Sequence, residues 1–207
     1  MFAYVKDGSI VSMPNGNKGI KIEDNQYPKT IFTLWTEAER NAIGVYTIEI
    51  DETNKKDSEY YTNTNITYAF GSGKVTGTYG TATAKAIADT KWTQAQIDDP
   101  SLVGQAPEGA DTNTVRLEGL KTLKKRELDN QCASILAPSD WRVTKQEDTG
   151  DNMNSGWKTW RASVRTKCNS MQTQIDNAAD TAALAALYTY NTDNPPTRPL
   201  GEFPVKE

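Results

Sequence analysis

The chain has 207 residues, 36% of them hydrophobic, and a formal net charge of −4, so it can form one large domain or two small ones. This mild negative charge gives no electrostatic case for nucleic-acid binding, which usually needs a clustered basic face. The sequence has no histidine, which removes the commonest general base, the usual catalytic triads and most zinc sites and argues against an enzyme.

The first segment is predicted to be an antiparallel β-hairpin followed by a loop. Residues 2–6 and 9–13 flank Asp7-Gly8, a two-residue turn signal that favours a hairpin. The loop follows at residues 14–17, whose sequence Pro-Asn-Gly-Asn combines residue types that favour turns.

A short helix and a strand are predicted next. Thr36 can cap the helix, because Glu39 stands at the spacing of a capping box. Gly44 can end the helix in a left-handed turn. Residues 45–50 alternate between apolar and polar side chains, which is the pattern of a half-buried strand. A polar break over residues 51–58 is predicted to be a loop.

A second hairpin is predicted around Gly71-Ser72-Gly73, because residues 60–70 and 74–86 are rich in threonine and tyrosine. With Lys74, this segment superficially resembles a phosphate-binding loop. The Walker spacing is missing, however, and no strand followed by a helix surrounds it, so a hairpin turn is the preferred interpretation.

Residues 97–114 carry prolines, glycines and several acids, which is the composition of a linker. The expected organisation is therefore a β-rich domain over residues 1–96, this linker, and a second domain over residues 115–207. Neighbouring carboxylates such as Asp98-Asp99, and Asp148 with Asp151, lack the ligand pattern of a calcium site. No metal and no cofactor are expected.

Beyond the linker the pattern becomes helical. Residues 115–136 carry one stripe of apolar side chains, and a basic run is predicted to be the solvated side of that helix. The run consists of Lys121, Lys124, Lys125 and Arg126. A second long helix, capped by Ser155, is predicted from apolar residues at spacings of three and four. These residues are Trp157, Trp160, Val164, Cys168, Met171 and Ile175.

Shorter elements complete the predicted C-terminal domain. Ser139 can cap a turn that contains Trp141, and Asp180 can cap a third helix over residues 182–190. Residues 195–204 are rich in proline and predict an extended, stiffened tail that docks on a partner or on its own helices. The expected fold class is α+β, with antiparallel hairpins in the N-terminal domain and a helical hairpin plus a short third helix in the C-terminal domain.

Two further features concern the side chains of the predicted helices. Cys132 and Cys168 are expected to remain reduced thiols. For the tryptophans, one interpretation places Trp157 and Trp160 in the core against residues 115–136, with arginines stacked on them or paired with acids. The other is a protein-binding face, since Trp and Arg are among the commonest interface anchors. The core interpretation is preferred for these two rings.

Several segments together resemble a known family. They are residues 117–121, 124–128, 135–141, 157–165 and 198–204, and more loosely residues 32–46. These segments resemble the tail assembly chaperones and tail-fibre assembly proteins of tailed phages, especially of phages infecting cyanobacteria. In that family a helix leads to a Leu-Leu-x-x-(Ser/Thr)-Asp-Trp turn. The next helix carries Trp-x-x-(Tyr/Trp)-Arg-x-x-(Leu/Val)-Arg before a proline-rich end. The residues that match this second motif are Trp157, Trp160, Arg161, Val164 and Arg165.

The resemblance implies a non-catalytic protein that binds a phage tail-fibre or baseplate polypeptide. The residues expected to bind this partner are Trp141, Trp157, Trp160, Arg161, Arg165, Arg198 and Phe203. The N-terminal domain is expected to supply a second contact or an attachment to other copies of the chain. The protein would be a chaperone in the host cytoplasm during assembly, or a resident of the virion tail with a larger interface.

An alternative of another class is a host-surface module in which exposed aromatics such as Tyr60 and Tyr61 contact glycan. No membrane association is expected, because no stretch approaches the roughly twenty apolar residues that span a bilayer. The first residues turn to charge and glycine too soon for a signal peptide.

Overall fold

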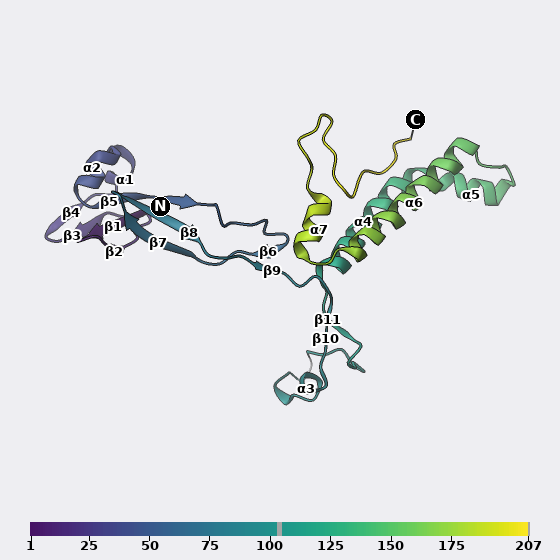
Figure 1. The fold of residues 1–207 in the computed structure, drawn as a ribbon, viewed down its shortest axis with the longest axis horizontal. Helices are drawn as coiled ribbons and strands as arrows, with labels where there is room; N and C mark the ends of the chain where they lie inside the picture. Colours follow the sequence, from purple (N-terminus) through teal and green to yellow (C-terminus); the bar gives the residue numbers. More distant parts are fainter. Residues whose placement is uncertain (103–104, 207) are drawn as a thin grey trace. The chain divides into compact units, whose positions relative to one another are not determined.

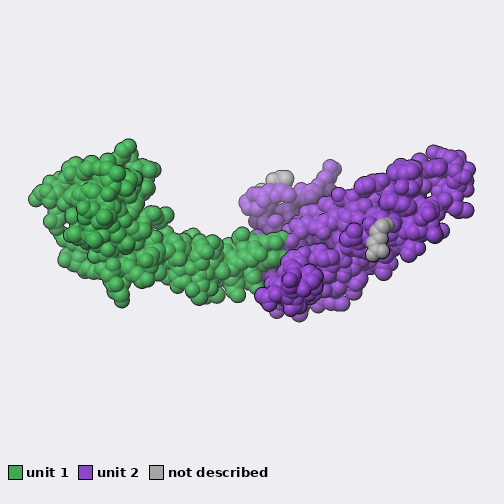
Figure 2. All heavy atoms as spheres, turned by 90° about the horizontal axis from the view of Figure 1, so that it is seen from above, with its two compact units in different colours: residues 1–83 green, residues 84–207 purple. Residues whose placement is uncertain are grey.

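A computed structural model describes residues 1–102 and 105–206 (Figure 1). The fold class is α+β, as predicted, with strands gathered in the N-terminal part and the long helices in the C-terminal part. The chain divides into two compact units, residues 1–83 and residues 84–207 (Figure 2). Residues 84–96, which the sequence assigned to the first domain, therefore belong to the second unit.

The first unit is built on a five-stranded sheet with strand order β2-β1-β5-β8-β7. Its strands are β1 (Phe2–Lys6), β2 (Ser9–Ser12), β5 (Val45–Asp51), β7 (Ile66–Gly71) and β8 (Lys74–Tyr79). Both predicted hairpins are present, as the antiparallel pairs β1–β2 and β7–β8. β5 pairs with β8 in parallel, and the edge strand β2 also approaches the edge strand β7, so the sheet is curled.

Side chains on both faces of this sheet are buried, because successive residues of a strand point to opposite faces. Ala3 and Val5 of β1 enter one core cluster with Ile48 and Val75. Phe2 and Tyr4, which alternate with them along β1, contribute to a second cluster with the hairpin β3 (Ile20–Ile22)–β4 (Asn25–Tyr27) and the helix α1 (Ile31–Leu34). Its members are Phe2, Tyr4, Ile22, Ile31, Phe32 and Val45.

The helix α2 (Glu37–Ala42) has the predicted capping box. The Thr36 hydroxyl accepts a hydrogen bond from the Glu39 amide at 3.3 Å, and the Glu39 carboxylate accepts one from the Thr36 amide at 2.7 Å. Gly44 follows the helix with φ of 79°, in the left-handed region, as predicted. The second hairpin is shorter than predicted, and a separate ladder joins β6 (Tyr61–Thr62) to β9 (Thr83–Ala84).

The second unit is built on two long helices that lie side by side, α4 (Leu120–Leu136) and α6 (Ser155–Asn177) (Figure 1). A 3-10 turn, Ala137–Ser139, leads from α4 to α5 (Asp140–Thr149), and α7 (Thr181–Tyr188) packs against α6. Buried side chains recur every four residues on α4 and every three or four on α6. They are Leu120, Lys124, Leu128, Cys132 and Leu136, and Arg161, Val164, Cys168, Met171 and Ile175.

The start of α4 differs from the prediction. Val115–Leu117 is a strand, β11, paired with β10 (Thr90–Lys91), and the helix begins only at Leu120. The Gly119 amide donates to Asp89 Oδ1 at 2.7 Å, and a Cβ at Gly119 would lie 2.3 Å from the Ala88 carbonyl carbon. The chain passes too close to itself here for any residue but glycine, so the backbone contact ends the strand and starts the helix.

Lys124 is buried, although the basic run was predicted to be solvated. Its ammonium pairs with Glu127 at 2.9 Å and lies 4.8 Å from the centre of the Tyr188 ring on α7. A long aliphatic stem and a charge with two partners make this burial tolerable. The helix caps agree more closely: Asp180 caps α7 as predicted, while the cap of α6 is Asn154, one residue before the predicted Ser155.

The expected linker carries short elements of its own. It includes the end of α3 (Gln94–Ile97), which has a capping box at Thr93, and a 3-10 turn, Pro100–Leu102. Residues 103–104 of the expected linker lie outside the described residues. β10 and β11 pair with each other, and both belong to the second unit. The chain between them is therefore a long connection within that unit and does not link two domains.

The chain after α7 forms neither helix nor strand over the described residues 189–206, in agreement with the proline-rich tail prediction. Leu200 is buried, and its amide donates to the Leu187 carbonyl at 3.0 Å. The Lys167 ammonium donates to the Leu200 carbonyl at 2.9 Å, so the tail returns along α6. Among the described residues, no helix is long and apolar enough to cross a membrane.

Candidate functional site

Arg161 joins the two sequence motifs that carry the family resemblance. Its guanidinium donates to the Leu136 carbonyl at 3.0 Å, to the Ser139 hydroxyl, and to Asp140 Oδ1 at 2.6 Å. Arg161 is only 5% exposed, whereas its partner Asp140 is largely in solvent. The sequence suggested that the Ser139 side chain caps this turn, but it does not cap α5. Its hydroxyl instead donates to the Leu136 carbonyl at 2.7 Å. One side chain of α6 therefore fixes the turn between α4 and α5.

This clamp changes the expected role of Arg161. The residue was predicted to contact a partner, but its burial and its three internal acceptors make it a structural residue. Arginine suits this task because its planar guanidinium presents several donors in a fixed geometry. Arg165, one turn further along α6, is exposed and keeps the capacity to bind a partner.

Beside the clamp, Arg142 lies between two tryptophan rings. Its guanidinium carbon is 4.4 Å from the centre of the Trp141 ring and 4.3 Å from that of Trp157. Both distances are within the range of cation–π interactions. Trp157 in turn meets Trp160 edge to face, with ring centres 5.5 Å apart. Arg142 was not among the predicted site residues, although its position directly after Trp141 indicates a possible cation–π contact.

Trp157 and Trp160 are less buried than predicted, since the prediction placed both rings in the core against residues 115–136. Both rings are half-buried, and the regular buried spacing on α6 passes through Arg161 instead. Trp160 Nε1 donates to the Pro204 carbonyl at 3.0 Å, and the Lys206 ammonium lies 5.4 Å from the Trp157 ring centre. The returning tail therefore covers part of these rings. Trp141 remains 56% exposed.

Two adjacent hollows open on this end of the helical unit. One, of about 220 Å³, is lined by Val143, Gln146, Met153, Lys158, Arg161 and Arg165. The other, of about 200 Å³, is lined by Trp141, Arg142, Lys145 and residues 151–154. Met153 lines both hollows, so they form one continuous surface. We call it the α5–α6 surface and define it by Trp141, Val143, Met153, Lys158 and Arg165.

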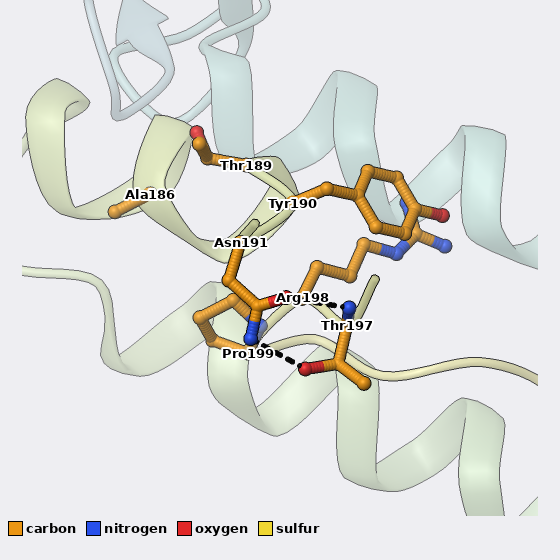
Figure 3. A pocket seen from close by; sticks show the side chains of 7 residues that line it. All are labelled: Ala186, Thr189, Tyr190, Asn191, Thr197, Arg198 and Pro199. Atoms are coloured by element: carbon orange, nitrogen blue, oxygen red, sulfur yellow. Dashed lines mark hydrogen bonds between the residues drawn. The ribbon is translucent and has the colours of Figure 1, made fainter. Parts of the chain in front are cut away.

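A further hollow, of about 510 Å³, lies where the chain leaves α7 (Figure 3). Asn191 closes it by donating to the Thr197 hydroxyl and accepting from the Thr197 amide, both at 2.8 Å. Arg198 reaches past the Tyr190 ring and pairs with Glu202 at 2.8 Å. Its guanidinium is thus engaged within the tail, away from the clamp, so the predicted site residues form two groups. Phe203, further along the tail, is half-buried.

Other candidate sites from the sequence lose support in the structure. Tyr60 is 3% exposed, so it is not the exposed aromatic that a glycan-binding surface needs, and Tyr61 is half-buried below the Lys56 ammonium. Ser72 and Gly73, both with positive φ, form the tight turn between β7 and β8 rather than a phosphate-binding loop. The described part of the chain brings together no group of three acidic, cysteine or histidine side chains that could hold a metal ion.

Compared with protein-family models, with curated proteins and with solved structures, the chain matches none of them. Its class is thus an α+β protein of two compact units whose helical unit presents the α5–α6 surface.

Proposed function

We propose that this protein is a non-catalytic accessory protein of a phage tail, which binds a tail-fibre or baseplate polypeptide through the α5–α6 surface. The observation that supports the proposal best is the Arg161 clamp. It joins the Ser139-Asp140-Trp141 turn to the tryptophan–arginine helix, which are the two motifs of the family that the sequence resembles. Residues that are distant in sequence thereby hold Trp141 in place at the surface.

The composition of the surface suits a transient interface. It combines an exposed tryptophan and two further apolar side chains with Lys158 and Arg165, which have no ion-pair partner among the described residues. Obligate interfaces are larger and more hydrophobic. We therefore favour a chaperone that acts in the host cytoplasm during assembly over a permanent component of the virion tail. Mass spectrometry of purified virions separates the two roles, because only a resident subunit is retained.

The proposal is tested by co-expressing the full chain with each fibre and baseplate protein of the phage and measuring capture and solubility. We expect one of these proteins to be retained, and Trp141→Ala to weaken its capture at least tenfold, since exposed tryptophans are frequent interface anchors. The matched control is Leu34→Ala, because Leu34 is 77% exposed but lies in the first unit. Capture that is unaffected by Trp141→Ala, or no capture of any fibre or baseplate protein, would contradict the proposal.

A further inference from the structure

We infer that the hollow lined by Lys158, Arg161 and Arg165 receives an acidic side chain, so that the protein recognises short segments in which Asp or Glu is flanked by apolar residues. The inference rests on the proposed function for the source of the partner. It adds the chemistry by which the partner is recognised, and this chemistry is testable without any phage protein.

Three cationic side chains lie together in the hollow. Lys158, Arg161 and Arg165 stand three and four residues apart, so they share one face of α6. The described residues that line the hollow include no acidic side chain. Within the described part of the chain, Lys158 and Arg165 are exposed and have no ion-pair partner, whereas Arg161 is held by Asp140. Cations held close together repel one another, and an incoming carboxylate relieves that repulsion.

The geometry of the cations favours a carboxylate. Arg161 is buried and fixed by the clamp, so it gives the floor of the hollow a defined position. Arg165 presents a guanidinium that can bind a carboxylate through two parallel hydrogen bonds. A volume of about 220 Å³ exceeds that of several waters, each of which occupies about 30 Å³ in the liquid, and so has room for one side chain.

The hollow also has an apolar wall, formed by Val143 and Met153. Val143 is 39% exposed, and Met153 is half-buried between the two hollows. Methionine adapts its shape to irregular apolar partners. Trp141 stands in the adjacent hollow with 56% of its surface exposed. A ligand that places a carboxylate between Lys158 and Arg165 therefore also meets apolar side chains of the same hollow and of the adjacent one.

A nucleic acid suits this surface less well. Glu147 and Asp148 of α5 and Asp151 after it are exposed, and the whole chain has a net charge of −4. A phosphate backbone needs several cations along its path, whereas this hollow offers two free ones. An acidic peptide needs only one such point of contact.

The test is selection of a randomised twelve-residue peptide library on the immobilised full chain. We expect the retained peptides to be enriched in Asp or Glu next to apolar residues. The affinity of the best peptide, measured by fluorescence anisotropy, should fall at least tenfold when its acid is changed to the matching amide. The double variant Lys158→Glu/Arg165→Glu should bind it at least tenfold more weakly, while Lys158→Arg/Arg165→Lys should retain binding.

The matched control is Lys18→Glu/Lys29→Glu, which changes the net charge equally but alters exposed lysines of the first unit. It should bind the peptide as the native chain does. Three results would overturn the inference: retained peptides without acidic enrichment, equal weakening by both double variants, or no peptide retained above the Lys158→Glu/Arg165→Glu background. A labelled single-stranded oligonucleotide that binds and is lost in that variant would assign the hollow to nucleic acid instead. If acidic peptides bind but no fibre or baseplate protein does, only the proposed function fails.

Discussion

Arg161 of α6 holds the turn before α5 and the first residue of α5 through its hydrogen bonds to Leu136, Ser139 and Asp140. Replacing it with methionine keeps the aliphatic bulk but removes the donor to the Ser139 hydroxyl and to Asp140, while the Leu136 carbonyl keeps its hydrogen bond from Ser139. We expect Arg161→Met to lower the free energy of unfolding by about 1–3 kcal/mol, the cost of leaving a buried polar group without its hydrogen bond. Urea unfolding followed by circular dichroism measures the change.

Arg165 supplies the control for this prediction. It lies on the same helix, but it is exposed and has no ion-pair partner among the described residues. Arg165→Met should therefore change the free energy of unfolding by less than about 0.5 kcal/mol. Equal effects of the two substitutions would show that the Arg161 hydrogen bonds contribute nothing to stability.

Cys168 permits a prediction on pH. Burial, with contributions from Cys132 and Asp129, raises the pKa of its thiol from an ordinary value of 9.0 to about 12. The native chain therefore holds this proton after the unfolded chain has lost it. The stabilising contribution is complete below pH 9 and declines as the pH rises from 9 toward 12. We expect the stability difference between the native chain and Cys168→Ala to shrink over this interval, as measured by urea unfolding.

The same burial bears on the chemical state of both cysteines. Cys132 and Cys168 are free and buried, as the sequence predicted. In the folded chain at pH 8 they should react slowly with a thiol reagent, because the thiolate is the reactive form. Both should react rapidly after unfolding without prior reduction. An intact mass two hydrogens short would show instead that they had formed a disulfide.

At the scale of elements, the sequence predicted best those features whose determinants are local. The Asp7-Gly8 hairpin, the Thr36 capping box and the Asp180 cap depend on a few neighbouring residues, and each is present. The parallel pairing of β5 with β8 depends on contacts between distant segments and left no periodic signal. β11 was assigned to a helix for the same reason, because only β10 distinguishes Val115 and Leu117 from helical positions.

The candidate site shows the same division. Helical spacing predicted the buried face of α6 from Val164 onward. At the start of the helix it favoured tryptophan over Arg161, because apolar periodicity takes no account of a buried cation with hydrogen-bond partners. The contact between Trp160 and Pro204 could not be predicted either, since a segment without regular structure has no periodic sequence pattern.

The tail is an element whose attachment can be tested directly. Leu200 is 1% exposed and anchors the segment that returns along α6. Leu200→Ala should cost about 2–4 kcal/mol, the range for a leucine lost from a packed site. It should also shift tryptophan emission to longer wavelength as Trp160 gains access to water. The control Val205→Ala alters a residue that is 86% exposed, and an equal shift in both variants would contradict the anchoring role.

At the scale of the whole molecule, the division into two compact units implies that each unit has its own free energy of unfolding. Gly77, on β8, has no room for a side chain, because a Cβ there would lie 2.8 Å from atoms of Ile66 and Tyr68. Gly77→Ala should destabilise the first unit by about 1–3 kcal/mol through overpacking. The helical unit should unfold as before. Hydrogen exchange that resolves the two units measures this, and equal loss of protection in both would show a single cooperative body.

The curl of the five-stranded sheet has a consequence for crowding and aggregation. Its edges, β2 and β7, face each other closely, so a foreign strand seeking to extend the sheet finds little open backbone along which to align. A sheet with unguarded edges can polymerise at high concentration, whereas the edges of this sheet offer little open backbone to another copy. If copies of the chain do join through the first unit, the five-stranded sheet is therefore better suited to contacts between side chains than to shared strands.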